Sequence, residues 1–261
     1  MQHTPEIFAQ YAHYYNLLYR DKDYEAESLY IASLIRKLHP QAHFVLELGS
    51  GTGIHASKLA TKGFNVHGIE RSSEMLNQSL ELAKTVNQKA VATCLSFSHG
   101  DIRNARLTDR FDVVVSLFHV ISYQTSNADV VAAFETARHH LTPGGIFIFD
   151  VWYGPAVLTQ RPEVRIKRIS DEKIEVTRLA EPTLHPNENR VDVCYHMFVR
   201  DRETKNVTEL RETHFMRFFF QPEIEFLAHT SRFTIQNAEE WQTAKPIGVD
   251  TWSACFCLQA L

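Results

Sequence analysis

The stretch VLELGSGTGI, Val45–Ile54, sets a short apolar run containing an acid directly before a loop with glycine at every second position. Such a run is typical of a buried strand. Glycines let the backbone pass close to a ligand, and a helix that follows the loop offers unpaired N–H groups and a positive dipole end. The stretch therefore predicts a strand, a ligand-binding loop and a helix, without identifying the ligand.

Strand-like runs and helical stretches alternate around this loop. The strand-like runs cover residues 43–48, 64–70, 92–98, 110–118 and 145–152, and helical spacing appears at 72–86 and 127–141. A further helix is predicted over 23–39, because Ile31, Leu34, Ile35 and Leu38 share one face before Pro40. Strands that alternate with helices indicate βαβ units and a parallel sheet.

The pattern changes after Trp152. From about residue 164 to 220 the sequence is rich in strands, and Val191, Val193 and Met197 fall on one side of a period-two alternation. This predicts an antiparallel sheet with one wetter face, followed by a helix over 222–233 and closing strands over 232–238 and 251–261. We expect four parts: an N-terminal helical cap (1–39), an α/β core that carries the glycine loop (40–152), an antiparallel insertion that forms a lid (153–220) and a segment that completes the core sheet (221–261).

Composition narrows the class of protein. The 261 residues are 44% hydrophobic with a net charge of -4, so the chain can build a large core and shows no basic excess for nucleic acid. No stretch reaches the roughly 18 apolar residues of a membrane span, and the first residues lack a secretory pattern. The four scattered cysteines form no disulfide framework. We therefore expect a cytoplasmic protein with reduced thiols, no nucleic-acid partner and no membrane.

The glycine loop lacks two phosphate-binding motifs. The dinucleotide motif would need glycine where Ile54 stands, and the P-loop would need lysine and serine or threonine after Gly53. Glu70, about 20 residues past the loop at the end of the second strand, is placed to accept hydrogen bonds from ribose hydroxyls. After the third strand, Asp101 could accept a hydrogen bond from the exocyclic amine of an adenine, with Ile102 packed against the ring. These features favour an adenosine-like ligand without essential phosphates.

With these motifs on hand, the chain resembles the class I S-adenosylmethionine-dependent methyltransferases. The resemblance covers residues 40 to 152 and includes the glycine loop, the acid that ends strand two, a Gly-Asp-Ile step and the sequence LTPGG at 141–145. It implies a Rossmann-like fold with a mainly parallel seven-stranded sheet, and S-adenosyl-L-methionine as cofactor with S-adenosyl-L-homocysteine as product. The implied cofactor-binding residues are Tyr15, Tyr24, Glu47, Gly49, Gly51, Gly53, Glu70, Met75, Asp101, Ile102 and Leu117.

A narrower resemblance concerns the parts outside the core. The segments YYNLLYRDKDYEAE, SLFHVISYQT and FDVWYGPAV are similar to methyltransferases that act on amino groups of nucleotide-linked sugars, and more distantly to glycine N-methyltransferases. In such relatives the N-terminal aromatic segment folds over the cofactor and an antiparallel insertion covers the acceptor. The resemblance places Tyr15 and Tyr24 near the sulfonium, whose positive charge an aromatic face attracts.

Two groups of residues are candidates at the acceptor. His119 and Tyr123 follow strand four at the carboxyl end of the sheet, where ligands bind in open α/β folds. Histidine is the usual general base, whereas tyrosine is suited to orienting the nucleophile. Trp152, Tyr153 and His214 are candidates for the acceptor wall. Cys255 and Cys257 share a strand face and could bind a soft metal in principle, but no further ligands accompany them, so we expect core packing and no metal.

The sequence thus predicts methyl transfer to a small polar acceptor, with the amino group of a nucleotide-linked sugar as first choice. The alternatives are O-methylation of a sugar or another small metabolite, and a non-catalytic protein that binds S-adenosylmethionine. An NAD-dependent oxidoreductase shares the glycine loop, but Ile54 argues against it. Monomer and homodimer both remain open.

Overall fold

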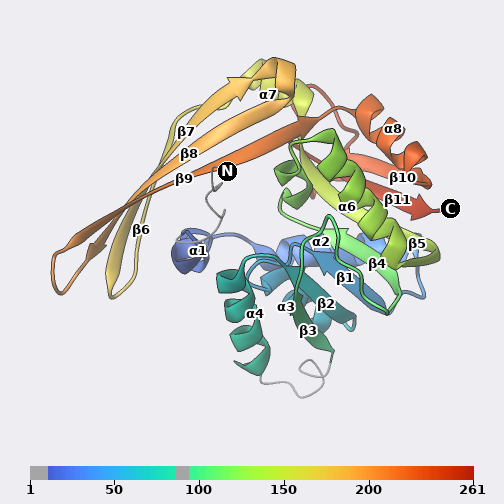
Figure 1. Cartoon of the computed structure of the whole chain (residues 1–261), viewed down its shortest axis with the longest axis horizontal. Helices are drawn as coiled ribbons and strands as arrows, with labels where there is room; N and C mark the ends of the chain where they lie inside the picture. The colour runs from blue at the N-terminus through green and yellow to red at the C-terminus, as the bar shows by residue number, and fades with distance from the viewer. Residues whose placement is uncertain (1–10, 86–93) are drawn as a thin grey trace.

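The computed structural model describes residues 11–85 and 94–261. Residues 1–10 of the expected cap, residue 86 of an expected helix and residues 92–93 of the expected third strand lie outside them. Seven strands make the core sheet in the order β3-β2-β1-β4-β5-β11-β10 (Figure 1). They are β1 (Phe44–Leu48), β2 (Asn65–Glu70), β3 (Leu95–His99), β4 (Phe111–Ser116), β5 (Leu141–Tyr153), β10 (Phe233–Glu240) and β11 (Ser253–Ala260).

The core sheet is mainly parallel, as predicted. The strands from β3 to β5 run parallel to their neighbours, and β11 runs antiparallel both to β5 and to β10. Parallel strands place their carboxyl ends at one edge, which is where the loops after β1, β2, β3, β4 and β5 meet. The Rossmann-like fold class with an antiparallel insertion after strand five is confirmed.

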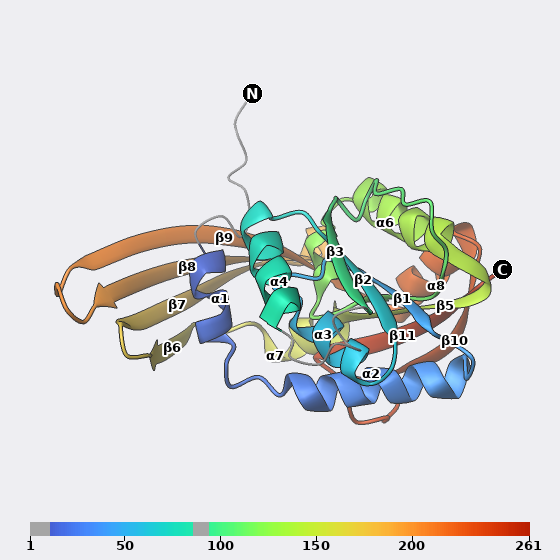
Figure 2. The same ribbon diagram turned by 90° about the horizontal axis from the view of Figure 1, so that it is seen from below.

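Helices cover both faces of this sheet (Figure 2). The helices α2 (Tyr24–Leu38) and α3 (Ile54–Thr61) lie on one face, and α6 (Asn127–His140) and α8 (Gln221–Thr230) lie on the other. Successive residues of β4 show the arrangement, because Val113 and Val115 pack toward α2 and α3 whereas Val114 packs toward α6. Burial on both faces explains why these strands are continuous apolar runs.

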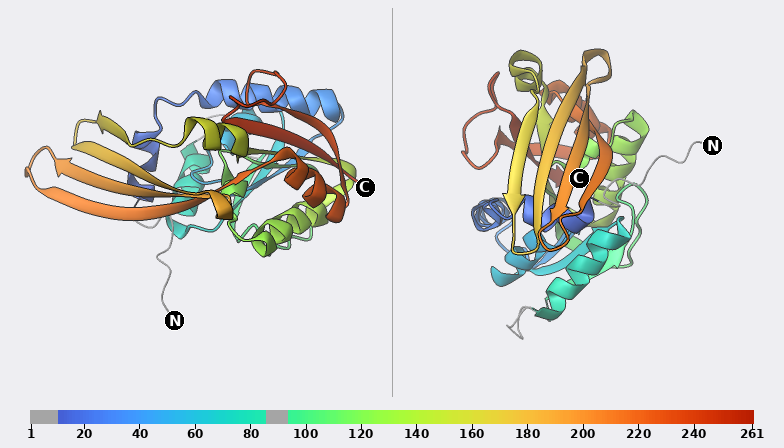
Figure 3. Two further views of the ribbon diagram at one scale, coloured as in Figure 1. Left: turned by 90° about the horizontal axis from the view of Figure 1, so that it is seen from above. Right: turned by 90° about the vertical axis from the view of Figure 1, so that its left-hand side faces the viewer.

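A second sheet projects beyond the core (Figures 1 and 3). It contains the antiparallel strands β6 (Arg165–Ser170), β7 (Ile174–His185), β8 (Arg190–Asp201) and β9 (Val207–Phe219). The end of β9 pairs with β5 through Trp152 with Phe218 and Tyr153 with Phe219, so the two sheets are joined. We call β6–β9 the lid sheet. The boundaries between the four expected parts, at residues 39, 152 and 220, stay predictions.

The N-terminal helix α1 (Ala12–Leu18) lies against the lid sheet (Figure 2). Leu18 is fully buried with Met197 and Val199 of β8, which confirms the inward face predicted by period-two alternation. The remaining elements are α4 (Ser73–Thr85), η1 (Val120–Tyr123), α7 (Gly154–Gln160) and η2 (Pro186–Glu188). Within the described ranges, no helix is long and apolar enough to cross a membrane.

Candidate active site

A cavity of about 460 Å³ lies between the glycine loop, the carboxyl ends of the core strands and the lid sheet. Its size falls in the range of small-molecule and cofactor sites. The predicted residues that line it are Tyr15, Tyr24, Glu47, Gly49, Gly51, Glu70, Met75, Asp101, Ile102, Leu117, His119, Tyr123, Trp152 and His214. The structure therefore brings residues from the N-terminal helices, the core and the lid sheet to one space.

The three loop glycines have different surroundings. All three have positive φ, at 75°, 55° and 79° for Gly49, Gly51 and Gly53, which only glycine adopts cheaply. A Cβ on Gly49 would lie 2.5 Å from Val120, and one on Gly53 would lie 2.6 Å from Phe97, so these two positions are closed by packing. A Cβ on Gly51 would meet nothing nearer than the Met75 sulfur at 3.8 Å. Gly51 therefore leaves its space open to the cavity, whereas Gly53 is not part of the lining.

Glu70 ties the loop to the end of β2. The backbone N–H of Gly51 donates to Glu70 Oε2 at 2.8 Å, and that of Ser72 donates to Oε1 at 2.7 Å. Burial raises the pKa of Glu70, and hydrogen bonds from Ser72, Gly51 and Arg71 act in the opposite direction. A carboxylate has about four acceptor positions, so capacity remains for a ribose hydroxyl.

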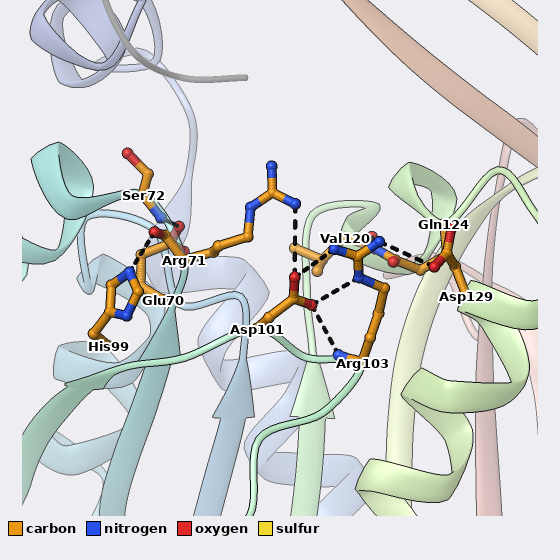
Figure 4. A network of polar contacts seen from close by, with 9 residues as sticks. All are labelled: Glu70, Arg71, Ser72, His99, Asp101, Arg103, Val120, Gln124 and Asp129. Carbon is orange, nitrogen blue, oxygen red and sulfur yellow. Dashed lines mark hydrogen bonds and ion pairs between the residues drawn. The ribbon is translucent and has the colours of Figure 1, made fainter. Parts of the chain in front are cut away.

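Asp101 lies in a network of charged groups (Figure 4). Arg103 donates to it through Nε at 2.9 Å, Nη2 at 2.6 Å and its backbone N–H at 3.0 Å. Arg103 also donates to Asp129 at 3.0 Å, and Arg71 lies 3.7 Å from Asp101. Burial would raise the pKa of Asp101, but the Arg103 contacts outweigh it and hold the pKa below the usual range. The expected contact with an adenine amine stays a prediction, and Arg103 is a lining residue that sequence reasoning missed.

Glu47 is a buried acid of the cavity with a raised pKa. It is 1% exposed at the end of β1, and burial, with a smaller contribution from Glu70, raises its pKa to about 8. The backbone N–H of Ala56 donates to it. In the part of the chain that the structure describes, its Oε2 has no hydrogen-bond partner. A buried carboxylate oxygen in this state is suited to receive a cationic group of a ligand.

Tyrosines form the wall over the glycine loop. Tyr15 from α1 and Tyr24 from the start of α2 both line the cavity, as does Tyr19, which the sequence did not single out. The rings of Tyr15 and Tyr19 lie 4.7 Å apart, and Lys22 stands 4.9 Å above the ring of Tyr24. Aromatic faces attract cations, as the position of Lys22 over Tyr24 illustrates, and the predicted sulfonium would be attracted to the tyrosine wall by the same effect.

His119 lies beside an acid on the neighbouring strand, to which its backbone N–H is hydrogen-bonded. Its Nδ1 lies 2.7 Å from Oδ2 of Asp150, and its backbone N–H donates to the same oxygen at 3.1 Å. Both Phe118 and His119 have φ of 63°, a costly conformation for these residues. The fold thus maintains local strain to bring His119 beside the fully buried Asp150. Asp150 was missed because the sequence shows it only as an acid inside an apolar strand.

The acceptor end of the cavity lies under the lid sheet. Trp152, Tyr195, His214 and Trp252 line it, and Tyr123 contacts His214 across the gap between core and lid. Tyr153, the neighbour of Trp152, does not line the cavity. Alternate residues of a strand point to opposite faces, so Tyr153 packs into the core with α8 residues such as Ile224.

The two cysteines of β11 lie in the core. Cys255 and Cys257 are fully buried in the cluster on the α2 side of the sheet. Among residues 11–85 and 94–261, no group of three or more histidines, cysteines or acids could hold a metal ion.

Known proteins share this architecture. Residues 45–145 match the family described as a methyltransferase domain. A Streptomyces fradiae protein, dTDP-3-amino-3,6-dideoxy-alpha-D-glucopyranose N,N-dimethyltransferase, is 29% identical over 82% of this chain and 80% of its own. The crystal structure of Streptomyces venezuelae DesVI is similar with a TM-score of 0.77 and 25% identity, over 96% of this chain and 98% of that one. The structure of CalS10 from Micromonospora echinaspora, with S-adenosylmethionine bound, shares the fold at a TM-score of 0.74 and 22% identity over the full length of both chains.

Fold, motifs and relatives together define the class of protein. The chain is a class I S-adenosylmethionine-dependent methyltransferase, and it resembles sugar N-methyltransferases within that class. The residues present fit this cofactor. Glu47 offers a buried acceptor oxygen for a cation, Gly51 leaves open space, and Glu70 retains acceptor capacity for a ribose.

Proposed function

We propose that the enzyme transfers methyl groups to the amino group of a nucleotide-linked sugar. The observation that carries the proposal is that a single cavity joins the cofactor end, at Gly51 and Glu70, to an acceptor end at His119, Tyr123 and Trp152. The Streptomyces fradiae relative, whose name specifies a dTDP-linked amino sugar, matches over most of this chain. CalS10 is described as an amino pentose methyltransferase and shares the fold over its whole length.

When bound, S-adenosylmethionine supplies an electrophilic methyl group on a positively charged sulfur. The residues of this chain then have to position the acceptor nitrogen in line with it, and such positioning alone accounts for several kcal/mol of barrier lowering. Trp152 and Tyr195 offer flat apolar surfaces for a sugar ring, while His119 and Tyr123 offer polar atoms for its substituents. An amine that is neutral near physiological pH needs little help from a base, whereas a hydroxyl needs a strong one.

The test is methyl transfer to matched acceptors, followed by mass spectrometry. A panel of nucleotide-linked amino sugars is incubated with cofactor beside the corresponding hydroxyl sugars. We expect mass gains of one or two methyl groups only on amino sugars. Transfer to the hydroxyl sugars would replace the proposal by O-methylation. Intact cofactor binding without transfer to any member would favour a different small acceptor or the non-catalytic alternative.

The proposal also covers the location, the oligomeric state and the partners of the protein. We propose a cytoplasmic enzyme that acts as a monomer or homodimer, with a small-molecule acceptor and no nucleic-acid or membrane partner. The support is the absence of a basic excess in the sequence and the small cavity. Light scattering of the purified protein would distinguish the two states, and a higher oligomer would contradict both.

A further inference from the structure

A chain of three hydrogen-bonded side chains crosses from the lid sheet to the core. Glu212 and His214 are two residues apart on β9, so they point to the same face of the strand. His214 Nε2 lies 2.9 Å from Glu212 Oε1, and His214 Nδ1 lies 2.9 Å from the hydroxyl of Tyr123 in η1. The last contact joins residues 91 positions apart in the sequence. The chain ends at the cavity, which both Tyr123 and His214 line.

The order of the three groups fixes the hydrogen-bond directions. An ionised Glu212 only accepts, so His214 must carry its hydrogen on Nε2. In a neutral imidazole, Nδ1 then accepts, and the hydroxyl of Tyr123 donates to it. Tyr123 lines the cavity, and a phenol oxygen can accept as well as donate, so it can serve as an acceptor for an N–H group of a ligand. His214, the central group of the three, is only 1% exposed, so the surrounding packing restricts its imidazole ring to this position.

Tyr123 is unsuited to act as a base alone. Burial, the neighbouring Tyr195 and Tyr19, and the charge of Glu212 raise its pKa well above the usual value, while Arg178 acts in the opposite direction. The phenol is therefore protonated under all ordinary conditions. It can accept a proton only if it passes its own to His214 in the same step.

We propose that Glu212, His214 and Tyr123 form a proton relay that receives the proton of the acceptor amine; this rests on the proposed function. The amine nitrogen donates to the Tyr123 oxygen, which directs its lone pair toward the methyl carbon. As the nitrogen–carbon bond forms, the carbon–sulfur bond breaks and its electron pair stays on sulfur. The nitrogen loses its proton to the Tyr123 oxygen, the tyrosine proton moves to His214 Nδ1, and the imidazolium is stabilised by Glu212.

The surroundings of His214 are suited to this role. The described groups that face it are aromatic hydroxyls and one cation at a distance: Tyr11, Tyr123, Tyr195 and, beyond Tyr11 and Tyr195, Arg178. Glu212 is the negative charge in hydrogen-bond contact with it. The imidazolium formed in the step therefore depends on Glu212 for its charge balance. Glu212 acts through His214 and is a positioning residue, whereas Tyr123 contacts the reacting amine.

The sheet offers a matched control. His196 of β8 lies 2.7 Å from Glu209 of β9, so the lid sheet holds a second pair of the same side-chain types, but Glu209 is 52% exposed and does not line the cavity. Glu209→Gln thus makes the same chemical change as Glu212→Gln without touching the relay. The conservative Glu212→Gln keeps the volume of the side chain, so loss of the fold does not confuse the result.

The first readout needs neither cofactor nor acceptor. Nitrogen NMR of the histidine rings in the cofactor-free protein gives the tautomer of His214, identified by the signal that disappears in His214→Gln. We expect hydrogen on Nε2 in the wild type and in Glu209→Gln, and a mixture of tautomers in Glu212→Gln. Hydrogen on Nδ1 in the wild type, or an unchanged tautomer in Glu212→Gln, would overturn the relay. This readout stands even if the acceptor is not an amino sugar.

The second readout is the pH profile of kcat with whichever acceptor the panel identifies. We expect Glu212→Gln to lower kcat by about 10- to 100-fold, with the KM for cofactor unchanged; this is less than the roughly 10²- to 10⁴-fold effect of a direct acid–base group, because Glu212 acts through His214. The pH profile of Glu212→Gln should differ in shape from that of the wild type, because its side chain no longer carries the charge next to His214. Glu209→Gln should match the wild type. Equal profiles for the two variants would refute the relay, and would leave the proposed function to be judged by the acceptor panel alone.

Discussion

Glu47→Gln should stabilise the cofactor-free enzyme at alkaline pH and weaken cofactor binding. The carboxyl group is fully buried at the end of β1, and its Oε2 has no hydrogen-bond partner among the described residues. Above its pKa the folded protein must therefore hold an uncompensated charge. Glutamine is nearly the same size, its oxygen can still accept from the backbone of Ala56, and it carries no charge.

The magnitude follows from the pKa of Glu47, which burial raises from 4.5 to about 8. At 1.36 kcal/mol for each pKa unit, the ionised form is disfavoured by about 5 kcal/mol. The folded protein keeps this proton up to about pH 8, whereas the unfolded chain loses it near pH 4.5, so stability falls as pH rises between those values. Glutamine avoids that loss but leaves amide hydrogens without acceptors, at a cost of about 1–3 kcal/mol. The net gain at alkaline pH is about 2–4 kcal/mol.

The assay is thermal unfolding of the cofactor-free proteins at several pH values. For a chain of this size a gain of about 2–4 kcal/mol corresponds to a rise in Tm of roughly 4–8 °C. We expect that rise above about pH 8, and its disappearance or reversal near pH 5. Glu172→Gln, on an exposed turn before β7, should leave Tm unchanged at every pH. A Tm difference for Glu47→Gln that is negative at alkaline pH and independent of pH would refute the reasoning.

Cofactor binding gives a second view of the same group. With a pKa of about 8, Glu47 is mostly protonated near pH 7, and a cationic ligand selects the ionised form. Binding should therefore release nearly one proton per cofactor near pH 7 and few above about pH 9. Calorimetry in buffers with different ionisation enthalpies measures this number. Glu47→Gln should bind more weakly and release no proton from this site.

Three further substitutions, one of them with a matched control outside the cavity, test other parts of the site. Glu70→Ala should raise the Kd for cofactor by about 10- to 100-fold, because hydrogen bonds to charged groups contribute about 1.5–3 kcal/mol; an unchanged Kd in calorimetry would contradict the ribose assignment. Gly51→Ala and Gly144→Ala both place a side chain at positive φ, with a cost of about 1–2 kcal/mol, so both should lower Tm by a similar amount. Only Gly51→Ala should also impair cofactor binding, since Gly144 lies away from the cavity. Asp150→Asn should lower kcat if His119 acts on the acceptor, and a kcat equal to that of the wild type would exclude that role.

The fold was predictable because its signals are local. A parallel strand that is buried on both faces has a continuous apolar sequence. The consecutive apolar residues Val113 and Val114 therefore predict that both faces of the strand are covered, without any knowledge of tertiary contacts. The lid sheet was predicted from a different pattern, in which apolar residues recur at every second position; Met197 and Val199 are two of these residues, and both are buried. The limits of each strand shift by a few residues, since hydrogen bonding to the neighbour decides where a strand ends.

The partners of the site residues were much less predictable. The sequence points to Asp101 but not to its pairing with Arg103 and Asp129, because charged side chains of this length reach several alternative partners. Trp152 and Tyr153 look equivalent in the sequence, and only the register of β5 turns one toward the cavity and the other into the core. In the sequence, Asp150 is an acid inside an apolar strand with no evident partner. In the structure, the turn after β4 places His119 beside it.

The same reasoning explains why the acceptor end is harder to infer than the cofactor end. Gly51 and Glu70 lie 19 residues apart on adjacent strand ends, so a single βαβ unit brings them together. Tyr123 and His214 meet only after the lid sheet has joined β5 through the end of β9. The cofactor site is therefore specified by one local unit, whereas acceptor recognition depends on how the lid is attached. Changes in the lid can alter the acceptor while the glycine loop keeps its geometry, and this is why the relay has to be tested on this chain itself.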